Sequence, residues 1–137
     1  MLPRLKQRGD FVRLNRRGKR AAAVGLVVQV DPIPADVDRT GDNAQMRPQM
    51  RVGFTATKKL GSAVVRNRVK RRLRALADEM LPVLARPGHD FVLIGRHATA
   101  TRDFAALRRD FIEALKRLKM VRDGADNDLR QWLASDQ

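Results

Sequence analysis

The chain has 137 residues, which suits one compact domain, and its net charge of +14 predicts a polyanionic partner, either nucleic acid or an acidic membrane surface. It contains no cysteine, which excludes disulfides and thiolate metal sites. No apolar run follows the N-terminal charges, and no segment approaches the roughly 18 apolar residues of a membrane span, so we expect a soluble, cytoplasmic protein.

The first predicted elements are a short helix and a buried strand. Asp10 is placed to cap a helix that begins at Phe11 and ends near Gly18, with Phe11 and Leu14 on one face. The run AAAVGLVVQV at 21–30 consists of small and β-branched residues. Such a run predicts a strand that is buried on both sides.

An acidic loop and a half-buried strand follow. Residues 31–49 contain three prolines, four aspartates and one glycine, which predicts an exposed loop longer than a hairpin connection needs. The next segment, RVGFTAT at 51–57, alternates apolar with polar or small residues. Its polar side carries Arg51, Thr55 and Thr57, so we predict a strand with a polar, cationic outer face.

A basic amphipathic helix gives the strongest signal in the chain. Ser62 stands at the N-cap position of a helix that begins at Ala63 and must bend or stop near Pro82. Six of the nine residues at 66–74 are Lys or Arg, and no acidic residue occurs at 43–77. One apolar stripe, at helical spacing, is formed by Val65, Val69, Leu73, Leu76 and Met80.

This concentration of like charge favours binding to a polyanion over an ordinary solvated face. Like charges at i, i+4 repel, and arginine can donate two parallel hydrogen bonds to a phosphate. The sequence shows neither a helix-turn-helix pattern nor a zinc finger. Arginines on several faces of one helix suit the irregular backbone of a folded RNA, although these physical arguments favour RNA over DNA modestly.

The last third of the chain predicts a strand, a helix and a tail. HDFVLIG at 89–95 has the composition of a buried strand, and 102–120 has apolar residues at helical spacing with cations outside. Residues 121–137 are polar with one tryptophan, Trp132, and we expect them to be disordered or weakly docked. The elements together predict an α+β domain over 1–120, in which helices and one mixed sheet form a sandwich.

The run RVGFTATKKLGSAVVRNRVKRRLRAL resembles the signature of the bacterial ribonuclease P protein component. Its central element is the RNR triplet at 66–68, and the preceding TKKLGSAVV is similar to the family's lead-in. The likeness extends over about 5–119, omitting 31–49, and includes LKQRGDF and DFVLIGR. It implies a two-layer αβββαβα sandwich with a mixed four-stranded sheet and a left-handed crossover, an exception to the usual hand.

The resemblance also implies a function. Members of this family are the protein cofactor of a ribonucleoprotein endonuclease that removes the 5′ leader from precursor tRNA. The RNA subunit performs the hydrolysis with Mg²⁺, which the RNA subunit and substrate hold, so no catalytic or metal-binding protein residue is expected. We expect a monomeric protein, one copy per RNA subunit, that contacts ribonuclease P RNA and precursor tRNA and no membrane.

The implied site has two parts, an RNA-binding surface and a cleft for the leader. The cleft is expected to contain Phe11, Thr55 and Thr57, where a base could stack on the aromatic ring. Phe11 has a competing role as the core anchor of its helix. Asn15 and Gln29 stand where many relatives have aromatic residues, which predicts that base stacking is weaker here or supplied differently. The RNA-binding surface is expected to comprise Arg51, Lys58, Lys59, Arg66, Asn67, Arg68, Lys70, Arg71, Arg72 and Arg74.

Other function classes are less favoured. A protein-borne nuclease would need carboxylates gathered around metal ions, but the acids of 1–120 are spread over separate elements. His89 and His97 are too far apart along a strand to act on one substrate atom. A general RNA-binding or ribosomal protein, or a DNA-coating protein, would fit the composition alone.

Overall fold

The computed structural model describes residues 2–35, 37 and 50–135. In chain order the elements are α1 (Arg8–Arg17), β1 (Lys19–Ala22), β2 (Leu26–Pro32), β3 (Met50–Thr55), the 3₁₀ turn η2 (Lys58–Leu60), α2 (Ala63–Leu84), β4 (His89–Gly95), the 3₁₀ turn η3 (His97–Ala100), α3 (Phe104–Arg117) and α4 (Asp126–Ser135). The α+β class and the mixed four-stranded sheet are confirmed. None of the helices in this part of the chain is long and apolar enough to cross a membrane.

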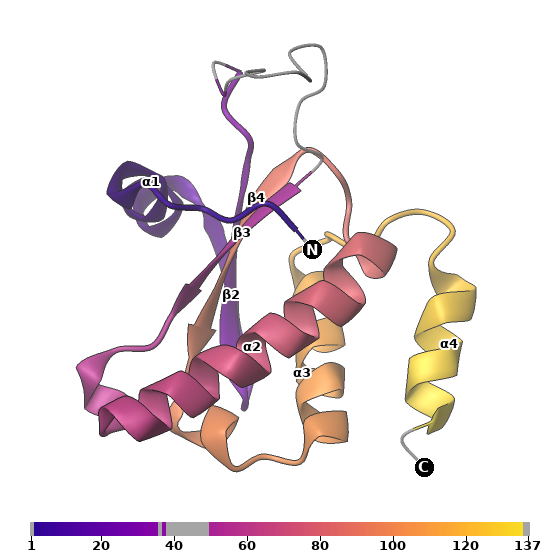
Figure 1. The fold of residues 1–137 in the computed structure, drawn as a ribbon. Coiled ribbons are helices and arrows are strands. Elements are labelled where there is room, and N and C mark those ends of the chain that lie inside the picture. The colour runs from indigo at the N-terminus through magenta and orange to yellow at the C-terminus, as the bar shows by residue number, and fades with distance from the viewer. Residues whose placement is uncertain (1, 36, 38–49, 136–137) are drawn as a thin grey trace.

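The sheet has the strand order β1-β2-β4-β3. β1, β2 and β4 pair antiparallel, whereas β3 and β4 are parallel neighbours joined through α2. The long helices α2 and α3 lie on one side of the sheet and α1 lies on the other (Figure 1). The sheet and the α2–α3 pair are thus the two main layers, and α1 covers part of the second face. The left hand of the β3–α2–β4 crossover stays a prediction from the resemblance.

The single strand predicted at 21–30 is wrong, because this run forms two strands. Ala21 pairs with Val28 across a tight hairpin, and the Ala23 N–H donates to the Leu26 carbonyl at 2.9 Å. Gly25 lies in the turn against α3, where a Cβ atom would lie 2.4 Å from Cδ2 of Leu107. The turn is hard to see in the sequence because Val24 and Gly25 continue an uninterrupted run of small and β-branched residues.

The apolar stripe of α2 is confirmed. Its members Val69, Leu73, Leu76 and Met80 are fully buried, in the main core between the sheet and α3. Ser62 caps the helix as predicted, accepting a hydrogen bond from the Val65 N–H at 3.4 Å. The helix continues two residues beyond Pro82 before it ends at Leu84.

The start of α1 differs from the prediction. The helix begins at Arg8, and Gln7 occupies the N-cap position without a side-chain hydrogen bond. Asp10 therefore lies inside the first turn, where its carboxylate pairs with Arg13 at 3.8 Å and with Arg51 at 3.5 Å. The predicted end at Gly18 is confirmed.

The C-terminal residues at 121–135 pack against the rest of the domain, which fits the docked alternative of the prediction. Most of this segment forms α4, with Ala125 and Leu129 buried against the main core. The Trp132 indole N–H donates to the Glu79 carboxylate of α2 at 3.2 Å.

Of the predicted acidic loop, Asp31 and Pro32 instead extend β2. Positions 36 and 38–49 of that loop, and 136–137 of the tail, lie outside the described residues.

Both outer strands of the sheet have contacts along their edges. The N-terminal segment bridges β3, with the Leu5 N–H donating to the Val52 carbonyl at 2.9 Å and the Val52 N–H donating to the Pro3 carbonyl at 3.0 Å. At the other edge, Arg117 of α3 donates to the carbonyl of Ala22 in β1 at 2.7 Å.

Candidate nucleic-acid interface

The basic residues of α2 divide into two groups by the direction in which they point. Because the apolar stripe packs into the core, the opposite arc of the helix faces solvent. Lys70, Arg71 and Arg74 are exposed on that arc and make no hydrogen bond or ion pair within the described residues. These three side chains, with Asn67 on the same exposed surface, are available to a partner. We call Lys70, Arg71 and Arg74 the free cations of α2.

Arg68 and Arg72 instead donate hydrogen bonds to carbonyls of the protein itself. The Arg68 Nε–H donates to the carbonyl of Ala100 at 2.7 Å. Arg72 donates to the same carbonyl at 3.4 Å and also to that of Arg102, and burial lowers its pKa, assisted by the positive charge of Arg68. The pair therefore fastens η3 and the start of α3 to α2. Arg66 is partly buried beside the first turn of the helix.

The predicted paired lysines lie immediately before α2. Lys58 and Lys59 are exposed in η2, whose chain continues through Ser62 into the helix. Thr57 precedes them beyond the end of β3, so it belongs with this turn and not with the strand. The lysines thus extend the basic surface of α2 toward the carboxyl ends of β3 and β4.

Phe11 and Thr55, predicted for a leader cleft, come from the face of the sheet that α1 covers. Phe11 is partly buried in a small apolar cluster with Leu5, Leu14 and Val92. Its ring lies against the backbone of β3, since a Cβ atom on Gly53 would be 2.6 Å from Phe11 Cζ. The ring therefore has a packing contact and an accessible part; the packing role is confirmed, and base stacking stays a prediction.

The two positions without the expected aromatic residues contact each other. The Gln29 side-chain amide donates to Asn15 Oδ1 at 3.2 Å, linking β2 to α1. Gln29 is 4% exposed, whereas Asn15 is exposed. An amide pair therefore occupies the two positions where the resemblance implies aromatic residues in many relatives, next to the Phe11 cluster.

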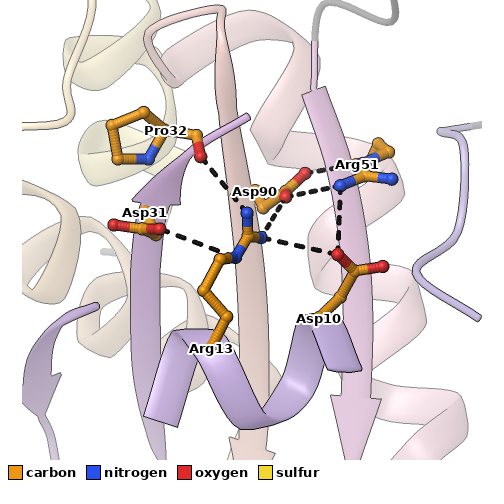
Figure 2. Close-up of polar contacts among 6 residues, drawn as sticks. All are labelled: Asp10, Arg13, Asp31, Pro32, Arg51 and Asp90. Atoms are coloured by element: carbon orange, nitrogen blue, oxygen red, sulfur yellow. Dashed lines mark hydrogen bonds and ion pairs between the residues drawn. The ribbon is translucent and has the colours of Figure 1, made fainter. Parts of the chain in front are cut away.

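Arg51 lies in an ion cluster away from the free cations of α2. Figure 2 shows its guanidinium against the carboxylate of Asp90, with two hydrogen bonds of 2.8 and 2.7 Å. Arg13 of α1 binds the same carboxylate, and Asp10 and Asp31 complete the cluster. The hydrogen bond to Asp90 raises the pKa of Arg51 above its ordinary value. Arg51 thus holds α1, β3 and β4 together, which is a structural role that the sequence alone did not predict.

Asp90 and Arg13 are the members of this cluster that sequence reasoning missed. Asp90 is fully buried at the start of β4, and a buried carboxylate requires a partner. An acid beside the apolar run FVLIG was a usable signal for a buried ion pair, but nothing in the sequence identifies Arg13 and Arg51 as its partners.

No group of three or more His, Asp or Glu side chains within the described ranges could hold a metal ion. His89 and His97 flank opposite ends of β4, and the His89 ring lies 3.0 Å from the Pro87 carbonyl.

The chain was compared with known proteins and solved structures. The family model described as Ribonuclease P matches residues 2–119. The ribonuclease P protein component of Paramagnetospirillum magneticum is 41% identical over 117 residues, which cover 85% of this chain and 83% of the relative. That of Caulobacter vibrioides is 45% identical over 112 residues, covering 82% and 68%.

Two solved structures share the fold. The RNase P protein of Thermotoga maritima superposes with a TM-score of 0.64 at 27% identity, covering 83% of this chain and 96% of that one. The RNase P protein of Staphylococcus aureus gives a TM-score of 0.68 at 24% identity, covering 89% and 100%.

Proposed function

The chain belongs to the ribonuclease P protein family, and we propose that it binds the RNA subunit of ribonuclease P through α2 and the 5′ leader of precursor tRNA through the α1 face of the sheet. In this role it supports endonucleolytic removal of the leader, which gives the mature 5′ end. One copy of the protein would serve each RNA subunit, in the cytoplasm.

The free cations of α2 are the observation that carries this proposal. Lys70, Arg71 and Arg74 form an exposed surface of one sign, and the helix holds no acid before Asp78 to neutralise them. Such a surface is unfavourable in the isolated protein because like charges repel. RNA phosphates remove that repulsion and release counterions, so the binding should weaken steeply with salt.

Among the described residues, no group of three or more His, Asp or Glu side chains is placed to hold a metal ion. Mg²⁺ prefers oxygen ligands in a near-octahedral arrangement, and the most buried carboxylate, Asp90, is already paired with Arg13 and Arg51. We therefore propose that the RNA subunit and the substrate hold Mg²⁺. The arginines of α2 then position phosphates and take no part in bond cleavage.

The proposal is tested by precursor-tRNA cleavage at low Mg²⁺ with the cognate catalytic RNA alone, the protein alone, and both together. We expect rapid cleavage when both are present and none with the protein alone. Cleavage by the protein alone would overturn the assignment of chemistry to RNA. Absence of cleavage in all three reactions, together with tight binding to another RNA, would favour a general RNA-binding protein.

Phe11→Ala is expected to weaken the binding of precursor tRNA to the assembled enzyme by about tenfold, because stacking on an aromatic ring is worth about 1–3 kcal/mol per base. The loss should disappear for tRNA without a leader. Val12→Ala is the matched control on the same helix, since Val12 is exposed. If Phe11→Ala lowers the thermal midpoint by several degrees and leaves leader binding unchanged, Phe11 is a core residue.

A further inference from the structure

A hollow of about 400 Å³ opens at the carboxyl ends of β3 and β4. β3 and β4 end together because they are parallel, with Thr55 opposite Ile94. The antiparallel pairing of Leu26 with Gly95 brings the β1–β2 turn to the same edge. Three segments far apart in the sequence therefore meet there, namely the turn at 23–25, η2 and η3.

The lining of the hollow is cationic. Its charges come from Lys59 and Arg96, the ring of His97 also lines it, and none of the lining residues is acidic. Lys59 makes no hydrogen bond or ion pair within the described residues. Arg96 uses one guanidinium N–H on the Ala23 carbonyl, at 2.8 Å, which fixes the side chain and leaves other N–H groups to donate elsewhere. The site is therefore suited to an anion.

The hollow is also held in shape before any ligand arrives. The Thr99 hydroxyl, fully buried, donates to the Gly25 carbonyl at 2.5 Å and accepts from the Arg96 backbone N–H at 2.8 Å. Arg68 of α2 donates to the carbonyl of Ala100, which holds η3 against α2. Binding to a site that is already ordered avoids part of the entropy cost of association.

The remaining wall is apolar. Val24 is 59% exposed at the tip of the β1–β2 turn, and Leu60 and Ala98 are partly buried beside it. Apolar side chains next to cations match a nucleotide, whose ribose and base edge are less polar than its phosphate. The lining contains no aromatic ring apart from His97, so recognition here would rest on phosphate and sugar.

We propose that this hollow binds one nucleotide of an RNA strand that continues from the free cations of α2, with the phosphate at Lys59 and Arg96 and the ribose against Val24. This inference rests on the proposed function, and it adds η3 and the β1–β2 turn to the RNA interface. η2 connects the hollow directly to α2, so one strand can follow both surfaces.

Val24→Glu tests the proposal, because it adds a negative charge to an exposed wall without removing a buried contact. The control is Asn127→Asp on α4, which changes the net charge equally at an exposed position. Affinity for the RNA subunit is measured across salt concentrations, as is affinity of the assembled enzyme for precursor tRNA. We expect Val24→Glu to weaken one of these by about fivefold or more and to reduce its salt slope by about one, as for a lost phosphate contact.

The measurement that weakens, either binding to the RNA subunit or binding of the assembled enzyme to precursor tRNA, identifies which RNA supplies the strand. Lys59→Ala should weaken binding to the same RNA. It keeps the test decisive if Val24→Glu fails to fold. If both variants bind both RNAs as Asn127→Asp does, the hollow is not a nucleotide site, and the proposed function stands. If the wild-type protein itself fails to bind the RNA subunit, the proposed function fails.

Discussion

Replacing Asp90 with alanine is expected to lower the free energy of unfolding by about 3–5 kcal/mol, the range measured when one partner of a buried ion pair is removed. The carboxylate is fully buried between Arg13 and Arg51, whose side chains are 16% and 14% exposed. Without this carboxylate, the guanidinium groups of both arginines remain largely out of water. Only the more exposed Asp10 and Asp31 would then balance their positive charge within the cluster (Figure 2). Urea unfolding followed by circular dichroism would measure the change.

Asp123→Ala provides the control for this experiment. Asp123 also pairs with an arginine, Arg86, at 3.4 Å, but its side chain is 95% exposed. An exposed pair contributes little, so its loss should change stability by less than about 0.5 kcal/mol. If Asp90→Ala changes stability no more than Asp123→Ala does, the cluster is not what fastens α1 to the sheet.

Changing all three free cations of α2 to alanine should weaken binding to the RNA subunit by about 100-fold at about 0.15 M salt. The estimate assumes one phosphate per side chain, with each contact worth a factor of about five at that salt concentration. The slope of log Kd against log salt should fall by about two to three. Folding should be unaffected because Lys70, Arg71 and Arg74 are exposed and unpaired within the described residues.

The control removes the same charge elsewhere, with Lys19, Lys116 and Arg130 changed together to alanine. These exposed side chains lie on β1, α3 and α4. A general effect of net charge would weaken RNA binding equally in both triple variants. An equal loss would therefore show that α2 has no special role, whereas a loss confined to the α2 variant would place the interface there.

Periodicity predicted the elements that bury one face. The stripe from Val69 to Met80 defined α2, and the alternation at 51–57 placed Arg51 and Thr55 on one side of β3. Periodicity alone, however, does not distinguish a cation that faces solvent from one at the border of the core. The sequence therefore assigns Arg68 and Arg72 to the same surface as the free cations, whereas in the structure they donate to carbonyls of η3 and the segment before α3.

Contacts between distant segments are what the sequence could not predict. Arg51 and Asp90 are 39 positions apart and meet because β3 and β4 are parallel, a pairing that neither strand reveals alone. α4 was missed for a different reason. Ala125, Leu129 and Trp132 have helical spacing, but three apolar positions in a polar segment predict a helix only weakly. Most of the stability of such a short helix comes from packing against the main core, which the sequence of the segment does not show.

The contacts along the sheet edges matter before RNA is present. An unpaired strand edge is a template on which another chain can add, which leads to aggregation. The backbone bonds of Pro3 and Leu5 to Val52 occupy the edge of β3, and Arg117 occupies the Ala22 carbonyl on β1. These contacts occupy part of each edge, and the net charge of +14 adds mutual repulsion, so both favour copies that remain apart before RNA is bound.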